Sequence, residues 1–486
     1  MHKIFITAVL FLFFFSACKN NSYEVKKEET YRMLESILKL KKKQLIQQMT
    51  ETRELARQLK NDKAMNAFFR VKNEYYYKSR DTVVSDFVEQ KIKELKQDIQ
   101  YHYVQNYLTF YDILFTDKNG EIFYTIRKQA DYHKNIFEGE LANTALSKKL
   151  RNLSEESFVD FQFYEVSGEP SAFFIEPVTH EGKTIGWFVM QYAINKINNL
   201  FTTETNLGST GELILVNKEH YMLTDSRFKA KPTILKQKLP DENIDAKFEE
   251  KKGRKSVTDY RGKVVYSAFD VFQFLSNEWL LIAKIDQNEI ITQHYLENKP
   301  ELYPQISSQI RSAVPQPTDI PGQPERKVIG VDIDEYQRAD SFSALTTQGV
   351  SECTALIAGI PGMFSYMAHI SPYDVIYDEN RTNLIQRILH RIDYIEITEA
   401  EKQSMQFFLV SAQPGSLQRA IDIILENGYF LSQIKVLIRQ DRDYANIYAD
   451  LSNNQIIITW IDRKNNTVTR ENFKHFIELN DMILHH

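Results

Sequence analysis

The amino-terminal part of the chain carries apolar residues at helical spacing. From Ser22 to about Asn61 they recur at intervals that place them on one face of an α-helix. They are Leu34, Leu38, Leu45, Ile46 and Met49. No proline or glycine interrupts this segment, and Gly120 is the first glycine of the chain. The same spacing returns between Val83 and Tyr107 and predicts a second helix there.

After residue 110 the pattern changes to short apolar runs separated by turns, which is typical of strands. The runs Tyr111–Phe115 and Ile122–Ile126 flank the turn Asp117-Lys118-Asn119-Gly120, a strong hairpin signal. Further strands are predicted over residues 158–166, 171–177, 185–192, 213–216, 264–269 and 279–286. A long helix followed by sheet modules is therefore expected up to about residue 292.

A proline-rich stretch then divides the chain. Six prolines lie between Pro300 and Pro324, and because proline fixes φ and lacks an N–H donor, this stretch is expected to be extended. We therefore predict a linker over residues 293–325 and a separate α/β domain over residues 326–486. In that domain an apolar helix over 417–425 precedes strands at 434–438, 445–449 and 456–460.

Residues 1–18 have the features of an export signal. An apolar run from Ile4 to Phe15 follows the basic Lys3, and Ser16-Ala17-Cys18 ends it. A run of about 12 residues is too short to cross a bilayer, which needs ~20, but it matches a signal-peptide core. The small residues before Cys18 resemble the bacterial lipoprotein signal. That resemblance implies a lipid on the Cys18 sulfur and a cell-envelope location, on the periplasmic side or the cell surface; the alternative is a short uncleaved anchor.

Charge and composition exclude several classes of function. The net charge of -5 gives no reason to expect nucleic-acid binding. No two-His or Cys/His cluster has metal-ligand spacing, and neither a Gly-x-x-x-x-Gly-Lys loop nor a dinucleotide motif is present. No metal and no cofactor is therefore expected.

Residues 208–286 carry a more specific pattern. Gly208-Ser209-Thr210-Gly211-Glu212 leads into the apolar run Leu213–Val216, and Tyr221–Phe228 follows after a turn. This pattern resembles the double Cache sensor domains of bacterial chemoreceptors and sensor kinases, with His220 where that family often has glycine. The resemblance implies that residues 28–292 form a long helix and two PAS-like sheet modules, with a small-molecule ligand in the membrane-distal module.

Four residues on inward strand positions are candidates for contact with that ligand. They are Tyr124, Asp160, Tyr164 and Tyr192. The alternative is that they are ordinary sheet residues. The Arg-x-Trp-Tyr pattern of amino-acid-binding Cache domains is absent, so the resemblance does not identify the ligand.

Cys353 is one of only two cysteines and, with Cys18 assigned to the lipid, the one remaining thiol. His369 follows it by sixteen residues. A cysteine needs a nearby base to become a nucleophilic thiolate near neutral pH, and histidine is the usual one. We therefore predict a catalytic dyad in which His369 lowers the pKa of Cys353.

The residues around this pair resemble the chemoreceptor glutamine deamidase family, CheD. Thr347, Gly349 and Cys353 match its Thr-x-Gly-x-Gly-Ser-Cys turn. Ala368-His369 and Pro372 match its second segment, in which Ala-His is followed by proline. The resemblance implies an α/β sandwich over residues 326–486.

It also implies roles for these residues. Cys353 would attack a primary carboxamide, such as an exposed glutamine of a protein substrate, and His369 would accept the thiol proton. Thr347 would orient His369 or the substrate, and N–H groups of the turn before Cys353 would hold the oxyanion. Ser351-Glu352 and Ser365-Tyr366 replace glycines of the family, which indicates a different substrate or an inactive copy.

Two functions follow from the sequence. The first is an exported, lipid-anchored protein that pairs a Cache small-ligand sensor with a cysteine-dependent amidohydrolase of the glutamine deamidase type. The second is a non-catalytic sensor or binding lipoprotein whose CheD-like domain serves docking. Both belong to the mixed α/β (α+β) fold class and reach the membrane through the lipid anchor.

Overall fold

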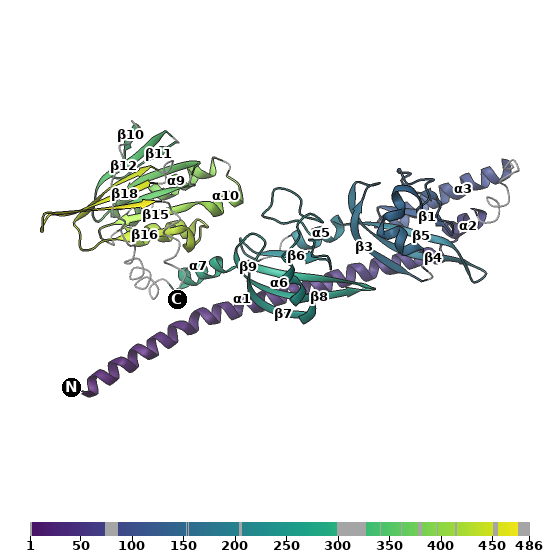
Figure 1. The fold of residues 1–486 in the computed structure, drawn as a ribbon, viewed down its shortest axis with the longest axis horizontal. Helices are drawn as coiled ribbons and strands as arrows, with labels where there is room; N and C mark the ends of the chain where they lie inside the picture. The colour runs from purple at the N-terminus through teal and green to yellow at the C-terminus, as the bar shows by residue number, and fades with distance from the viewer. Residues whose placement is uncertain are drawn as a thin grey trace. The chain divides into compact units, whose positions relative to one another are not determined.

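The computed structural model describes residues 2–474 with gaps, and of residues 2–21 only the backbone. The gaps are 73–85, 152, 154, 204–206, 299–326, 341, 361, 378–381, 396, 414–415 and 451–454. The described residues form a mixed α+β protein with a long amino-terminal helix and four sheets (Figure 1). The chain divides into two compact units, residues 27–286 and residues 287–486 with 1–26.

Among the described residues, three helices open the first unit, and helical spacing predicts the first and the third of them. α1 runs from His2 to Gln58 and ends in a 3-10 turn, Leu59–Asn61. α2 spans Lys63–Val71. α3 spans Asp86–His102 and continues as a π-helical turn, Tyr103–Tyr107. The first three residues of the helix predicted over 83–107 lie outside the described residues.

The first sheet of this unit has five antiparallel strands in the order β2-β1-β5-β4-β3. They are β1 (Asp112–Asp117), β2 (Ile122–Thr125), β3 (Ser157–Tyr164), β4 (Glu169–His180) and β5 (Lys183–Ala193). One face packs aromatic rings against α2, where Phe69 contacts Phe115 and Phe188. The opposite face packs an apolar core against residues 136–150, which include the turn Gly139–Asn143 and α4 (Ala145–Leu150).

The second sheet has four strands in the order β6-β9-β8-β7. They are β6 (Glu212–Val216), β7 (Lys252–Thr258), β8 (Val264–Phe274) and β9 (Asn277–Asp286). α5 (Asn195–Thr202) precedes this sheet in the chain, and α6 (Asp241–Glu250) covers one of its faces. α1 contacts both sheets, because Gln48 bonds to Tyr192 of β5 at 2.6 Å and Lys42 to Asp270 of β8 at 2.7 Å.

The second unit contains two five-stranded sheets that share an apolar core. The first sheet has the order β10 (Lys327–Gly330), β12 (Ser343–Val350), β17 (Tyr444–Asp450), β18 (Gln455–Asp462) and β19 (Thr467–Lys474). The second has the order β11 (Glu335–Ala339), β14 (Phe364–Ile370), β13 (Thr354–Ile360), β15 (Gln406–Ser411) and β16 (Ile434–Ile438). Side chains alternate along each strand, so the second sheet buries its other face in a second core.

Helices supply the rest of that second core. They are α9 (Leu384–Asp393), α11 (Leu417–Glu426) and α7 (Gln287–Glu297), while α10 (Glu399–Ser404) and the turns Tyr373–Tyr377 and Leu431–Gln433 complete the described helices of this unit. Tyr295 of α7 is 1% exposed in this core. Residues 293–297, predicted as the start of the linker, are therefore helical and belong to this unit. The predicted linker from residue 299 onward lies outside the described residues.

Candidate functional sites

A group of buried polar side chains lies at one end of the first sheet, on the face that packs against residues 136–150. Asp112, the first residue of β1, is 1% exposed. Its Oδ1 atom accepts hydrogen bonds from the N–H groups of Ile113, Ile126 and Arg127 at 2.7, 2.9 and 3.2 Å. Its Oδ2 atom is buried and has no hydrogen-bond partner in the described part of the chain.

Asp131, Tyr164 and Gln191 complete this group, which we call the acidic cluster. The Tyr164 hydroxyl donates to Oδ2 of Asp131 at 2.8 Å. Gln191 pairs with Asp112 in the β1–β5 register and donates through Nε2 to Ser171 at 2.7 Å. Oδ1 of Asp131 and Oε1 of Gln191 are buried and have no donor among the described residues. The cluster therefore holds three buried acceptor atoms that need donors.

The pKa values of the two aspartates also indicate that the acidic cluster lacks positive charge in the described part of the chain. Burial and, to a smaller extent, the charge of Asp131 raise the pKa of Asp112 to about 6. The hydrogen bonds from the backbone N–H groups oppose this rise. Burial also raises the pKa of Asp131, although the hydrogen bond from Tyr164 opposes the shift. Each unsatisfied buried acceptor costs ~1–3 kcal/mol. A ligand that brings N–H donors and a positive charge would remove that cost.

The structure brings only Tyr164, of the four predicted ligand contacts, into the acidic cluster. Tyr124 lies on the opposite face of the sheet, where its ring packs against Phe68 and Phe115. It lines a groove of about 460 Å³ beside α3, with the Lys96 ammonium 5.7 Å from its ring. Burial and the charge of Lys128 lower the pKa of Lys96.

Asp160 and Tyr192 hold neighbouring elements in place. Asp160 accepts two contacts from the indole N–H of Trp279 in β9, at 2.9 and 3.0 Å. Burial raises the pKa of Asp160 to about 6, against the effect of the Trp279 hydrogen bond. The hydroxyl of Tyr192 accepts a hydrogen bond from Gln48 of α1. Neither residue reaches the acidic cluster through a hydrogen bond in the described part of the chain.

In the second unit, Thr347 and His369 meet across the core between the two sheets. Thr347 Oγ1 donates to the carbonyl oxygen of Val331 and lies 2.8 Å from Nδ1 of His369. A hydroxyl has one hydrogen to donate, so Nδ1 of His369 must carry the proton and donate to Thr347. The neutral ring then presents Nε2 as an acceptor, and Nε2 is buried without a partner in the described chain.

Cys353 lies directly before β13 and packs against the same core. In the β13–β14 register, Ala355 is paired with His369. Cys353 lies two residues before Ala355 in the chain. No hydrogen bond between the Cys353 sulfur and His369 occurs in the described residues. The structure thus places the predicted dyad on one face without joining its atoms.

The pKa directions contradict one prediction for this dyad. Burial raises the pKa of Cys353, and Asp334 and Glu352 add to the rise. Burial lowers the pKa of His369, although Asp334 and Asp332 oppose the shift. The prediction that His369 lowers the pKa of Cys353 is wrong here, because the buried ring is neutral and supplies no positive charge. The dyad can work only if His369 takes the thiol proton during attack.

The turn before Cys353 leaves N–H groups unused. Two serines lie at its carbonyl oxygens: the Ser411 hydroxyl is 2.8 Å from the carbonyl oxygen of Cys353, and the backbone N–H of Ser416 donates to the carbonyl oxygen of Glu352 at 3.4 Å. Among the described residues, no acceptor is found for the N–H groups of Glu352 and Cys353. Gly349 begins the turn at φ 72°, where a bulge interrupts the β12–β17 register. The oxyanion role of these N–H groups stays a prediction.

Tyr366, one of the residues in place of the family's glycines, does not block this face. Tyr366 is 4% exposed and packs against Tyr336 and Phe364 in the helix-covered core. Because side chains alternate along a strand, Tyr366 points away from the face that carries His369. Beside Asp334 the surface opens into a groove of about 700 Å³, lined by three arginines that make no ion pair within the described chain. They are Arg338, Arg387 and Arg391.

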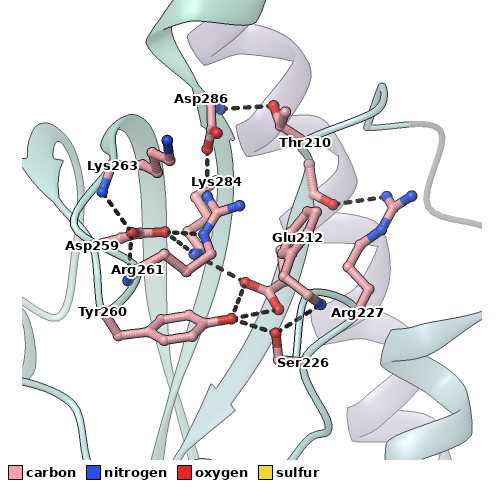
Figure 2. A network of polar contacts seen from close by, with 12 residues as sticks. Thr210, Glu212, Ser226, Arg227, Asp259, Tyr260, Arg261, Lys263, Lys284 and Asp286 are labelled. Atoms are coloured by element: carbon pink, nitrogen blue, oxygen red, sulfur yellow. Dashed lines mark hydrogen bonds and ion pairs between the residues drawn. The ribbon is translucent and has the colours of Figure 1, made fainter. Parts of the chain in front are cut away.

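A network of buried charges crosses the second sheet of the first unit (Figure 2). Lys284 lies 2.9 Å from Glu212 and also bonds to Asp259. Arg261 pairs with Asp259 at 2.7 Å and with Asp286. Burial would raise the pKa of Asp259, but Lys284 and Arg261 outweigh it and hold that pKa below its usual range. Sequence patterns gave no sign of this network.

The predicted lipid site, Cys18, belongs to the residues whose side chains are not described. The backbone there is part of α1. Within the described residues no helix is long and apolar enough to cross a membrane. Nor does any group of three or more His, Cys, Asp or Glu side chains there have the arrangement of a metal site.

No protein-family model and no curated protein matches the chain. The periplasmic sensory domain of the Campylobacter jejuni chemoreceptor Tlp1 is similar in structure, with 15% identity, 55% of this chain and 98% of that chain covered, and a TM-score of 0.40. The ligand-binding domain of the Pseudomonas fluorescens chemoreceptor CtaA, in complex with L-isoleucine, has 12% identity, 57% and 98% coverage and a TM-score of 0.35. An extracellular ligand binding receptor from Desulfohalobium retbaense has 13% identity and a TM-score of 0.33; the match covers 51% of this chain but 39% of that receptor. Because these TM-scores lie below 0.5, the functions proposed below rest on the residues of the chain itself.

Proposed function

We propose that the first unit is a Cache-type sensory domain outside the cytoplasm that binds a small molecule carrying an ammonium group. The observation that carries this proposal is the acidic cluster, in which buried oxygens of Asp112, Asp131 and Gln191 have no donor among the described residues. The pattern around Gly208–Glu212 and Tyr221–Phe228, which resembles double Cache sensors, supports the sensory assignment. The export signal and the lipid on Cys18 would place the domain in the cell envelope.

An ammonium group matches the chemistry of this cluster. It offers three N–H donors and no acceptor, so one group can satisfy acceptors from three side chains. Its charge would also stabilise the ionised form of Asp112, whose pKa burial raises to about 6. The apolar core next to the cluster, which includes Leu114 and Val189, favours an aliphatic part on the ligand.

The test is calorimetric titration of the full chain at pH 8 with n-alkylamines and L-amino acids, each compared with the alcohol of equal length. We expect at least one amine to bind and its alcohol not to bind. Asp112→Asn and Asp131→Asn should each weaken binding tenfold or more, which corresponds to about 1.4 kcal/mol. Asp98→Asn, an exposed change on α3, is the matched control. Equal binding of amine and alcohol, or unchanged affinity in both cluster variants, would disprove the proposal.

The hydrogen bond between Thr347 and His369 favours a second function, hydrolysis of a primary carboxamide by the second unit. In this reaction the Cys353 sulfur attacks the amide carbon while Nε2 of His369 takes the thiol proton. The N–H groups of Glu352 and Cys353 would bind the oxyanion. The C–N bond then breaks, His369 protonates the leaving ammonia, and water hydrolyses the thioester to release a carboxylate. A glutamine on an exposed protein segment is the substrate we propose, and no cofactor takes part.

Ammonia release from glutamine-containing envelope proteins tests this second function. Cys353→Ser should abolish release, because a hydroxyl is a far weaker acid than a thiol with a pKa of about 8.5. Thr347→Val should slow release and shift its pH profile, since the ring would lose the partner that fixes its tautomer. If Cys353→Ser releases ammonia as fast as the wild type, the dyad plays no part. The domain then serves docking, the non-catalytic alternative.

A further inference from the structure

A small cavity lies under α6 in the second sheet of the first unit, away from the acidic cluster. Its volume is about 40 Å³, above the ~10–15 Å³ that one water molecule needs. Most of its wall is aliphatic, contributed by residues such as Ile214, Leu239, Ile244, Val265 and Ile282. Such a cavity can take a group of a few heavy atoms with an apolar part.

Two polar side chains line this cavity without hydrogen-bond partners in the described part of the chain. Lys247 of α6 is 3% exposed, and the contact found for its ammonium is the ring of Phe269 at 5.8 Å. Ser267 of β8 is 1% exposed, and its Oγ atom is unpartnered. A buried ammonium without a carboxylate or hydrogen-bond acceptor is costly. Burial, with a smaller effect from the charge of Lys255, lowers the pKa of Lys247 to about 8, although the charge of Glu250 opposes the shift, so most of it is still charged at pH 7.

The acidic residue of the wall does not serve as that acceptor. Asp259 lines the cavity, but its carboxylate is held by Lys284 and Arg261 in the network of Figure 2. Tyr260 donates its hydroxyl hydrogen to Glu212 at 2.9 Å. These groups are bonded to one another and do not accept from Lys247. The carboxylate of Glu250 acts on Lys247 through its charge, without an ion pair between the two among the described residues.

We propose that this cavity binds a small monocarboxylate of the acetate or propionate class, with its carboxylate on Lys247 and Ser267. One carboxylate oxygen accepts from the ammonium and the other from the hydroxyl, which is a charge-assisted arrangement. The short alkyl chain contacts the aliphatic wall. Phosphate or sulfate fits less well, because such an anion carries more acceptors than these two side chains can satisfy and has no apolar part. This second site is independent of the amine site in the first sheet.

The experiment is calorimetric titration of the full chain with sodium propionate at pH 7, with chloride held constant. We expect binding by the wild type, at least tenfold weaker binding by Lys247→Met, and a smaller loss in Ser267→Ala. Methionine keeps the length of lysine and suits an aliphatic cavity. Lys252→Met, an exposed change on the neighbouring strand β7, should bind like the wild type. Neutral propionamide should not compete.

A second measurement uses the wild type alone, in case Lys247→Met does not fold. Propionate should slow reductive methylation of Lys247, followed by mass spectrometry, and leave the rate at Lys252 unchanged. Absence of propionate binding, equal binding by Lys247→Met, or unchanged methylation of Lys247 would each overturn the proposal. Displacement of propionate by chloride at equal concentration would show a simple anion site and would overturn the carboxylate assignment.

Discussion

Replacing Lys284 with methionine tests whether the charge network of Figure 2 stabilises the second sheet of the first unit. Lys284 is 2% exposed and contacts Glu212 and Asp259. Methionine keeps the apolar stem but removes the charge. Among the described residues, Arg261 would then be the one cation left in the network for three buried carboxylates, those of Glu212, Asp259 and Asp286.

The size of the effect follows from the burial of these groups. Removing one partner of a buried ion pair costs ~3–5 kcal/mol. With a dependence on urea of ~1–3 kcal/mol per molar, the unfolding midpoint should fall by about 1 M or more. Lys251→Met is the control. Lys251 forms a 2.8 Å ion pair with Glu278, and its side chain is exposed. An exposed pair contributes ~0–1 kcal/mol.

Tryptophan fluorescence can follow this sheet alone. The three tryptophans lie in different sheets: Trp187 in β5, Trp279 in β9 and Trp460 in β18. In a background with Trp187→Phe and Trp460→Phe, Trp279 reports urea unfolding of the second sheet. Measuring one sheet avoids treating a chain of several modules as a single two-state system.

The pH dependence of the loss of stability in Lys284→Met gives a further check. Asp259 has a folded-state pKa below its usual range. Such a group stabilises the fold above its unfolded pKa of ~3.9, and the stabilisation is lost as pH falls through the lower folded pKa. The cost of Lys284→Met should therefore be larger at pH 7 than well below pH ~3.9, where Asp259 loses its charge. An unchanged midpoint at pH 7, or a cost that does not vary with pH, would refute this reasoning.

Three more predictions concern single residues. Because burial raises the pKa of Cys353, iodoacetamide should label it slowly at pH 7 and faster only above pH ~9; fast labelling at pH 7 would contradict the neutral thiol. Gly349→Ala should destabilise the second unit by ~1–2 kcal/mol, measured by Trp460 fluorescence, because alanine is strained at φ 72° although space for its methyl group is present; no loss of stability would count against the turn geometry. Cys18→Ala should leave the protein unlipidated and in the soluble fraction, whereas unchanged membrane partition would favour an uncleaved anchor.

Strands with apolar patterning were predictable, and polar strands were not. The predicted strand Tyr111–Phe115 begins one residue before β1, and Ile434–Ile438 coincides with β16. β7 and β19 were missed because residues such as those of Lys252–Thr258 show no apolar alternation. These strands are fixed by pairing with a neighbour, β8 for β7 and β18 for β19. A pattern confined to one segment does not contain that information.

The candidate sites, too, were predictable only where a local sequence motif marks them. Thr347 and His369 were found through a motif, and the structure joins them by a hydrogen bond. Asp112 and Asp131 were missed because chain folding, and not local sequence, brings them into one cluster. The one signal available was Asp112 itself, an aspartate inside the otherwise apolar run Tyr111–Phe115. Whether a polar residue is satisfied depends on partners far away in the sequence.

The most direct test of the amine site is the pH dependence of binding by the tightest amine of the panel. Asp112, with its pKa raised to about 6, is largely protonated at pH 5.5 and must release its proton when an ammonium group binds. Titration calorimetry in buffers of different ionisation enthalpy should therefore show proton release at pH 5.5, none at pH 8, and an affinity that rises between them. In Asp112→Asn the release should disappear. An affinity and proton count that do not change with pH would contradict the assignment of the ligand to Asp112.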